Sequence, residues 1–104
     1  MIRNVVTATL AVTLVLAAVG DAATPRVEIH QFKFVPAQLT VPVGATVTWT
    51  NGDDETHTVT ATDRTYTSTG LEHAETFTHR FTTPGTYTYF CALHPHMAAT
   101  VVVK

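Results

Sequence analysis

The chain has 104 residues, which is enough for one small domain and no more. Six lysine and arginine residues against eight aspartate and glutamate residues give a formal net charge of −2. Because a protein that binds polyanions needs a basic face, this balance argues against nucleic acid as a partner. Cys91 is the single cysteine, so an internal disulfide is excluded.

The N-terminal segment has the layout of a secretory signal peptide. Arg3 supplies a short positive region, residues 5–19 form an unbroken run of small and apolar side chains, and small residues surround Asp21. We therefore predict a signal peptide over residues 1–22, cleaved after Ala22 or Ala23, and export to the periplasm. An uncleaved anchor is the alternative, because the apolar run is only slightly shorter than the ~20 residues of a membrane-spanning helix.

The predicted mature domain, residues 23–104, has the pattern of an all-β protein. Short segments rich in Val, Thr, Phe and Tyr are separated by proline and glycine, without helical periodicity. In chain order we expect strands at 27–34, 39–43, 47–49, 57–61, 77–81, 87–91 and 100–103. The apolar parity changes between Ile29 and Phe32, which indicates a bulge or a bend between sheets. About seven strands with frequent turns predict a Greek-key, two-sheet β-sandwich.

Metal-binding residue types lie between the last two predicted strands. Cys91, His94 and Met97 offer a thiolate, an imidazole and a thioether at three-residue intervals. Two imidazoles and one thiolate with a weak methionine form the ligand set of an electron-transfer copper site. His57, just after a polar turn, is the obvious second imidazole. Metal ligation would also protect the lone cysteine of an exported protein.

Taken singly, these residues have ordinary structural interpretations. Cys91 could be a buried thiol and Met97 a core side chain, and His94 could be a surface residue. Their joint spacing favours a metal site, for which zinc is a weaker alternative because it prefers cysteine, histidine and carboxylate ligands. The sequence shows neither a hydrolytic triad nor a second cysteine for dinuclear copper, so we do not expect an enzyme.

Two motifs give the chain a family resemblance that covers nearly all of the predicted domain. They are Trp49-x-Asn51-x-Asp53 leading to His57, and Pro84-Gly85-Thr86-Tyr87-x-Tyr89-x-Cys91-x-x-His94-x-x-Met97. In residue types, order and spacing they resemble the cupredoxins, small type 1 blue copper proteins. Within that family the pattern is most similar to amicyanin and pseudoazurin, with plastocyanin further off. His96 departs from it, because amicyanin-like loops usually have an apolar residue there.

The resemblance implies a protein that binds one copper ion and shuttles single electrons between redox partners, such as a c-type cytochrome and a dehydrogenase or oxidase. Its ligands would be His57, Cys91, His94 and axial Met97, and the Thr58 backbone N–H would donate to the Cys91 sulfur. We expect a monomer that is not inserted in a membrane after cleavage. A copper-binding module for delivery or resistance is the rival function.

Other side chains are expected to have mainly structural roles. His79 is predicted in or near the core with hydrogen-bonded ring nitrogens, and His30 and His73 at the surface. His96 has three interpretations: an exposed imidazole at a docking face, which we favour, a competitor of Met97 for the metal, or a pH-sensitive group. The predicted aromatic core consists of Phe32, Phe34, Trp49, Phe77, Phe81 and Tyr87.

Two surface features could assist docking. Leu93, Pro95 and Ala98 flank His94 and could form a small apolar patch, although ordinary loop packing is the alternative. The acidic run at residues 53–55 could steer a basic partner, although such a run is more often a solvated turn.

Overall fold

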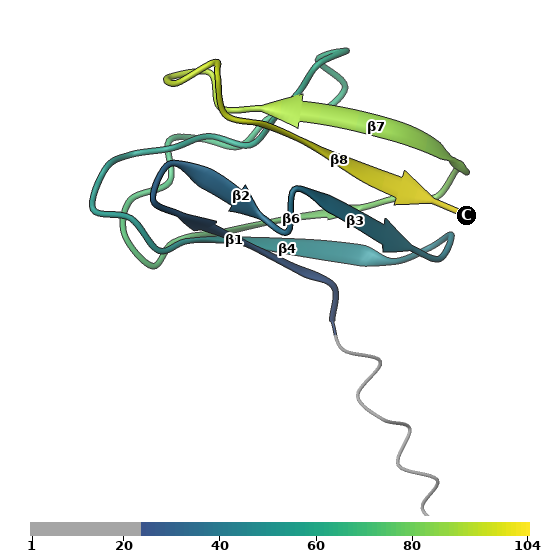
Figure 1. Ribbon diagram of the computed structural model, residues 1–104. Helices are drawn as coiled ribbons and strands as arrows, with labels where there is room; N and C mark the ends of the chain where they lie inside the picture. Colours follow the sequence, from purple (N-terminus) through teal and green to yellow (C-terminus); the bar gives the residue numbers. More distant parts are fainter. Residues whose placement is uncertain (1–23) are drawn as a thin grey trace, which may run out of the picture.

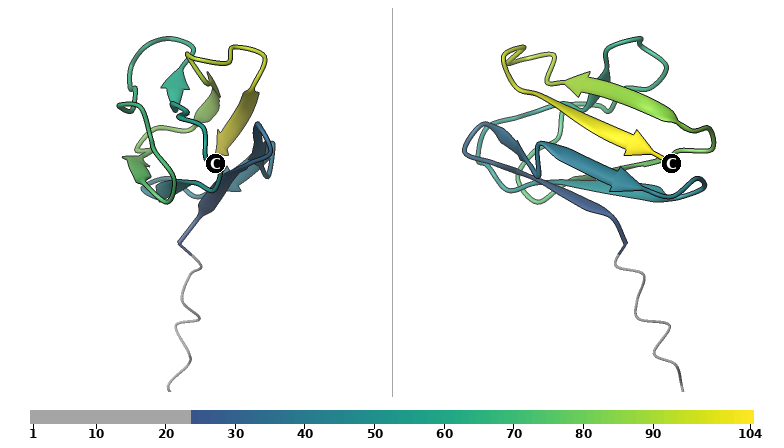
Figure 2. Two further views of the ribbon diagram at one scale, coloured as in Figure 1. Left: turned by 90° about the vertical axis from the view of Figure 1, so that its left-hand side faces the viewer. Right: turned by 45° about the vertical axis from the view of Figure 1, so that its right-hand side comes forward.

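The computed structural model describes residues 24–104, which form two four-stranded sheets (Figure 1). The strands of the first sheet lie in the order β2 (Lys33–Val35), β1 (Arg26–His30), β4 (Thr46–Asn51) and β6 (Thr76–Arg80). Those of the second lie in the order β3 (Gln38–Val41), β8 (Ala98–Val103), β7 (Gly85–Phe90) and β5 (Thr60–Ala61). Figure 2 shows these sheets as two layers. The expected all-β sandwich is confirmed.

The predicted signal peptide lies outside the described residues. Within residues 24–104, the structure contains no helix of the length and apolarity needed to cross a membrane.

Two of the predicted strands differ from the structure. The segment 27–34 is two antiparallel strands, β1 and β2, with His30 paired to Lys33 across a two-residue turn. The parity change that suggested a bulge or bend is therefore a tight hairpin. The segment 57–61 pairs regularly with β7 only at residues 60–61, because the residues before them belong to the connection that holds His57.

Chain connections bring distant segments to one end of the sandwich. Apart from the hairpins β1–β2 and β7–β8, every connection between consecutive strands crosses between the two sheets. β1 runs parallel to β4, and β3 runs parallel to β8. As a result the β1–β2 turn, the β4–β5 connection and the β7–β8 connection lie together, at the end away from the C-terminus (Figure 1).

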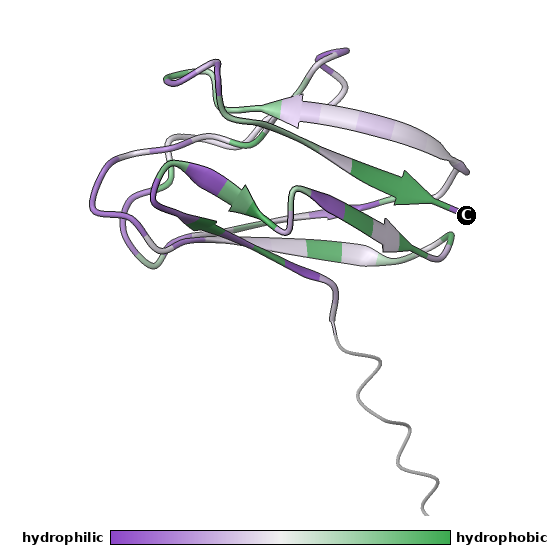
Figure 3. Cartoon of the chain, in the orientation of Figure 1, coloured by the Kyte–Doolittle hydropathy of each residue, from purple (hydrophilic) through white to green (hydrophobic). Residues whose placement is uncertain are grey.

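The core forms from side chains that alternate along the strands, as expected for sheets with one buried face. Hydrophobic residues recur along β1 and dominate β8, whereas the connections are mainly hydrophilic (Figure 3). Trp49 is fully buried, with its ring centroid 5.4 Å from that of Tyr89. Of the predicted core aromatics, three are buried and two are partly buried against the core: Phe34, Trp49 and Phe81, then Phe77 and Tyr87.

One prediction about core side chains is wrong, and a second is confirmed only in part. Phe32 is 36% exposed, because it lies in the β1–β2 turn and not in a strand. His79 is partly buried as expected, but its ring stacks on Tyr66 with centroids 4.1 Å apart. Within residues 24–104 no protein group hydrogen-bonds to its ring nitrogens, and burial lowers the pKa of His79.

Candidate metal centre

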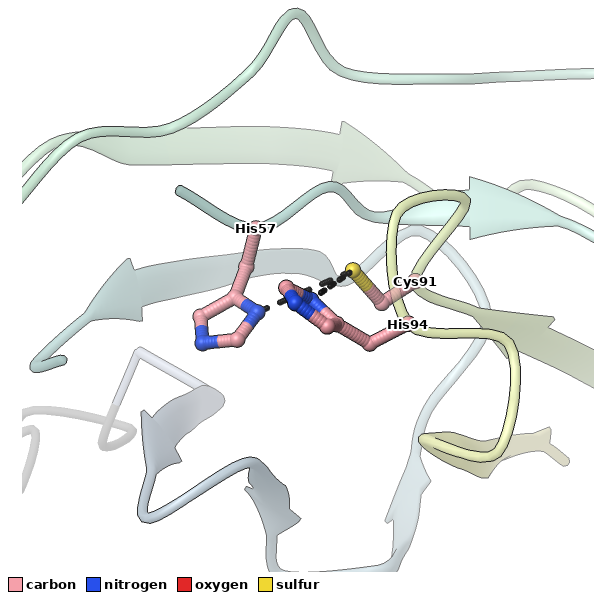
Figure 4. Close-up of side chains that lie close together, drawn as sticks. All are labelled: His57, Cys91 and His94. Atoms are coloured by element: carbon pink, nitrogen blue, oxygen red, sulfur yellow. Dashed lines mark hydrogen bonds between the residues drawn. The ribbon is translucent and has the colours of Figure 1, made fainter. Parts of the chain in front are cut away.

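Three of the predicted ligands converge from two connections at the same end of the sandwich. The Nδ1 atoms of His57 and His94 each lie 3.7 Å from the Cys91 Sγ. All three donor atoms lie within 4.8 Å of one another. Figure 4 shows the two imidazoles directed toward the sulfur, one from the β4–β5 connection and one from the β7–β8 connection. His57 and Cys91 are fully buried, and His94 is partly exposed.

Backbone hydrogen bonds fix the segment from Cys91 to Met97. The Cys91 N–H donates to the Met97 carbonyl over 3.0 Å, and the Met97 N–H donates to the His94 carbonyl over 2.9 Å. The His94 N–H in turn donates to the Cys91 carbonyl over 3.2 Å. Met97 is only 3% exposed, so its thioether is held inside the fold at the base of this loop.

Thr58 joins the two ligand-bearing connections. Its backbone N–H donates to the Cys91 Sγ over 3.3 Å, as the family resemblance led us to expect. Its side-chain oxygen accepts a hydrogen bond from the Ala92 N–H over 2.8 Å. A hydrogen bond to sulfur stabilises the thiolate and is one of the ways a protein tunes a metal site.

Asn51, at the end of β4, organises the connection that leads to His57. Its side-chain nitrogen donates to the carbonyls of Glu55 and Leu71, both over 2.8 Å. Its side-chain oxygen accepts from the Asp53 N–H over 2.9 Å. The His57 backbone then pairs with Leu71 in both directions. Since Asn51 is completely buried, these bonds satisfy a polar group that would otherwise be costly to bury.

Asp53 is not part of a solvated turn, which corrects the interpretation of the acidic run. It is 9% exposed, whereas Asp54 and Glu55 are exposed. Its Oδ2 lies 2.9 Å from the His57 Nε2. Burial raises the pKa of Asp53, but hydrogen bonds from the Phe32 and Gln31 backbone and from His57 outweigh this effect and lower it. The carboxylate is therefore ionised at neutral pH.

The orientation of His57 fits a metal ligand. An ionised carboxylate only accepts hydrogen bonds, so the His57 Nε2 bears the proton and its Nδ1 keeps a free lone pair. That lone pair faces Cys91 and His94. Donor atoms separated by 3.7 Å suit one shared ion at metal–ligand bonds of about 2 Å. Two imidazoles and a thiolate form the donor set that copper prefers in electron-transfer sites.

The remaining histidines lie outside this donor set. His30 and His73 are exposed, as predicted. His96 is also exposed, with its ring centroid 6.5 Å from that of His94. Among the histidine, cysteine, aspartate and glutamate side chains of residues 24–104, the atoms that could share one metal ion belong to His57, Cys91 and His94. Two residues next to the site, Asp53 and Phe32, were not predicted from the sequence to support it. The position of Asp53 four residues before His57 was the available signal.

Comparisons with known proteins agree with this fold and donor set. The Cupredoxin-like domain model matches residues 5–103. The chain is 32% identical over 90 residues to amicyanin-alpha of Methylorubrum extorquens. The aligned region covers 82% of this chain and 76% of that protein. It is 33% identical over 83 residues to amicyanin of Paracoccus denitrificans, and here the aligned region covers 75% of this chain and 63% of that protein.

Solved structures of copper proteins are also similar to this chain. A purple cupredoxin from Nitrosopumilus maritimus is similar with a TM-score of 0.74 and 30% identity, covering 77% of this chain and 99% of that one. A Cu-containing nitrite reductase from Thermus scotoductus is similar with a TM-score of 0.72 and 30% identity, but only 22% of that chain is covered. The chain belongs to the cupredoxin-like family, and one copper ion is its cofactor.

Proposed function

We propose that this protein is a periplasmic electron carrier that holds one copper ion with His57, Cys91, His94 and Met97. The observation that carries the proposal is the convergence of two Nδ1 atoms and one Sγ within 4.8 Å. When bound, copper supplies a one-electron couple between Cu(II) and Cu(I). Its amicyanin and plastocyanin relatives support electron transport and not catalysis on a substrate.

The protein's own contribution is a set of hydrogen bonds that holds the donor atoms in position. Cys91 and His57 are fully buried, and hydrogen bonds from Thr58 and to Asp53 hold their donor atoms in place. The loop that includes His94 and Met97 is closed by backbone hydrogen bonds. Fast electron transfer requires little rearrangement between the two oxidation states, and this framework provides a nearly fixed ligand set.

The partly exposed His94 marks the side where a redox partner would dock. Its neighbour Leu93 is 55% exposed, and Pro95 and Ala98 are exposed as well. Three exposed apolar side chains close to His94 in the sequence support the docking patch that the sequence suggested. We infer that electrons enter and leave through this surface, and that the protein acts as a monomer.

The charges nearby favour a partner with a basic face. Exposed carboxylates lie on the two segments that hold His57, residues 51–57 and 71–75: Asp54, Glu55, Glu72 and Glu75. Arg80, beside Gly44, and the C-terminal Lys104 lie toward the opposite end. Lys33 and Arg64 are exceptions, and the Arg64 guanidinium lies 5.1 Å from the centroid of the Phe90 ring, next to Cys91. Such an arrangement steers a cationic surface toward the site, and the effect weakens with added salt. A basic c-type cytochrome would fit.

Copper titration tests the proposal. Adding Cu(II) to the purified protein should give an intense thiolate-to-copper absorption band, a reversible potential and fast self-exchange. A weak band with slow exchange would favour copper delivery instead. Cys91→Ala should abolish the band, whereas His96→Ala, which changes an exposed imidazole outside the donor set, should keep it. Retention of the band in Cys91→Ala would overturn the ligand assignment. The mass of the exported protein would test cleavage after Ala22 or Ala23.

A further inference from the structure

The β1–β2 hairpin turns through two residues in an unfavourable conformation. Gln31 and Phe32 have φ angles of 50° and 58°, in the left-handed region. Two-residue hairpin turns with positive φ at both positions normally use Asn-Gly or similar pairs. For other L-residues this conformation costs roughly 1–2 kcal/mol each. Such strain persists only where the surrounding structure imposes it, and it is concentrated at functional sites.

One carboxylate holds this turn in place. The Gln31 N–H donates to the Asp53 Oδ1 over 2.7 Å, and the Phe32 N–H donates to the Asp53 Oδ2 over 2.9 Å. The same Oδ2 accepts from the His57 Nε2 over 2.9 Å. Asp53 therefore fixes both the turn and the ring of a predicted ligand, although these segments are more than 20 residues apart in the sequence.

The turn places an aromatic ring against both imidazoles. The Phe32 ring centroid lies 5.0 Å from that of His57 and 5.1 Å from that of His94, in each case nearly perpendicular at 89°. Phe32 is 36% exposed, so its outer side faces solvent while the ring contacts both histidines. An apolar group in this position limits the access of water to the site.

We propose that Asp53 and Phe32 act as one positioning unit, in which Asp53 orients His57 and holds Phe32 as an apolar cover over the two imidazoles. This proposal rests on the proposed copper function. Water and a higher local dielectric stabilise the more highly charged form of a metal site. The cover should therefore shift the equilibrium toward Cu(I) and raise the reduction potential. Asp53 should favour the His57 tautomer whose Nδ1 can bind metal.

Phe32→Gly tests the cover. Glycine relieves the left-handed conformation, which offsets the lost ring contacts and the added freedom of the unfolded chain, so the stability of the metal-free fold should change little. Loss of the ring should raise the Cu(II)/Cu(I) ratio at a fixed applied potential about threefold or more, which is about 30 mV at 59 mV per tenfold. Phe32→Leu, which keeps an apolar side chain, should shift the ratio less.

Ala74→Gly is the matched control for the cover, because Ala74 also has a positive φ, of 66°, and is exposed. The Ala74 side chain is not one of the metal-binding groups found among residues 24–104. The Ala74→Gly variant should relieve backbone strain without changing the reduction potential. If Phe32→Gly shifts the potential no more than Ala74→Gly does, the cover is excluded.

Asp53→Asn tests the positioning role in the metal-free protein. An asparagine amide can donate to the His57 Nε2, which would place the ring proton on Nδ1. Nitrogen NMR of the His57 ring should show the Nε2-protonated form in the wild type and a loss of that form in the variant. Copper affinity should fall about 10- to 100-fold, as is typical for residues that orient a ligand.

The double variant Asp53→Asn with Phe32→Gly tests the coupling of the two residues. Because glycine removes the strain that Asp53 offsets, Asp53→Asn should destabilise the metal-free protein less in this background than in the wild type. Additive effects, or an unchanged His57 tautomer in Asp53→Asn, would overturn the positioning unit. Both measurements use the metal-free protein, so they can disprove the positioning unit without testing copper function. A failure of the electron-carrier proposal would appear separately, as an absent copper absorption band.

Discussion

The Thr58 backbone N–H lies 3.3 Å from the Cys91 Sγ, although the two residues are 33 positions apart. The same residue accepts a hydrogen bond from the Ala92 N–H through its hydroxyl. Thr58 thus holds together the connections that present His57 and Cys91. The donor set depends on this junction because its members belong to loops, whose positions no single strand fixes.

Thr58→Val should weaken the junction without changing side-chain shape much. It removes the acceptor of the part-buried Ala92 N–H and also the buried hydrogen bond between the Thr58 and Thr60 hydroxyls. An amide left without a partner costs about 1–3 kcal/mol, so the unfolding free energy of the metal-free protein should fall by that amount. Chemical denaturation measures it. Thr88→Val, which removes an exposed hydrogen bond to Thr62, should cost less than about 0.5 kcal/mol. Equal losses would contradict the role of Thr58.

Asn51→Ala should be more damaging, because it leaves two carbonyls and one N–H without their side-chain partner. We expect a loss of about 3 kcal/mol or more in unfolding free energy. The connection before His57 should also loosen, which would weaken copper binding. Gln38→Ala, at an exposed position of β3, is the control and should have little effect. A loss below about 1 kcal/mol in Asn51→Ala would show that other contacts hold the connection.

Met97→Leu should keep copper binding but raise the reduction potential, because a weak thioether donor is replaced by a side chain that cannot bind the metal. Leucine is similar in volume to methionine, so the metal-free protein should lose less than about 1.5 kcal/mol despite the burial of this position. Voltammetry of the copper form measures the potential. An unchanged or lower value would count against ligation by Met97.

His79 should make stability depend on pH. Burial lowers its pKa in the folded state from 6.5, so the unfolded chain binds more protons below about pH 6.5. The stabilising contribution of neutral His79 is therefore present above pH 6.5 and is lost as the pH falls toward the lowered pKa. His79→Phe keeps an aromatic ring against Tyr66 and removes the titration.

Denaturation of the metal-free wild type and His79→Phe at pH 5 and pH 8 measures this effect. The stability advantage of the variant should be larger at pH 5, since other titrating groups contribute equally to both proteins. A difference between the two proteins that does not change with pH would show that His79 does not contribute through its protonation.

The sequence alone was sufficient to predict the sandwich and the candidate ligands. Alternating apolar residues and regular turn signals specify half-buried strands, because side chains on a strand have a period of two. Cys91, His94 and Met97 lie within one short loop, so their closeness in the sequence already predicted that these three candidate ligands are close in space. His57 was inferred from its position after a turn and from the family resemblance.

Only the tertiary structure showed how that site is supported. Phe32 was assigned to the core because it shares a parity with Phe34, but a left-handed turn places it against His57 and His94. Asp53 was grouped with its exposed acidic neighbours, although it is buried and binds three groups. Periodicity reports which face of a strand is buried, whereas these contacts depend on where crossing connections place loops that are far apart in the chain.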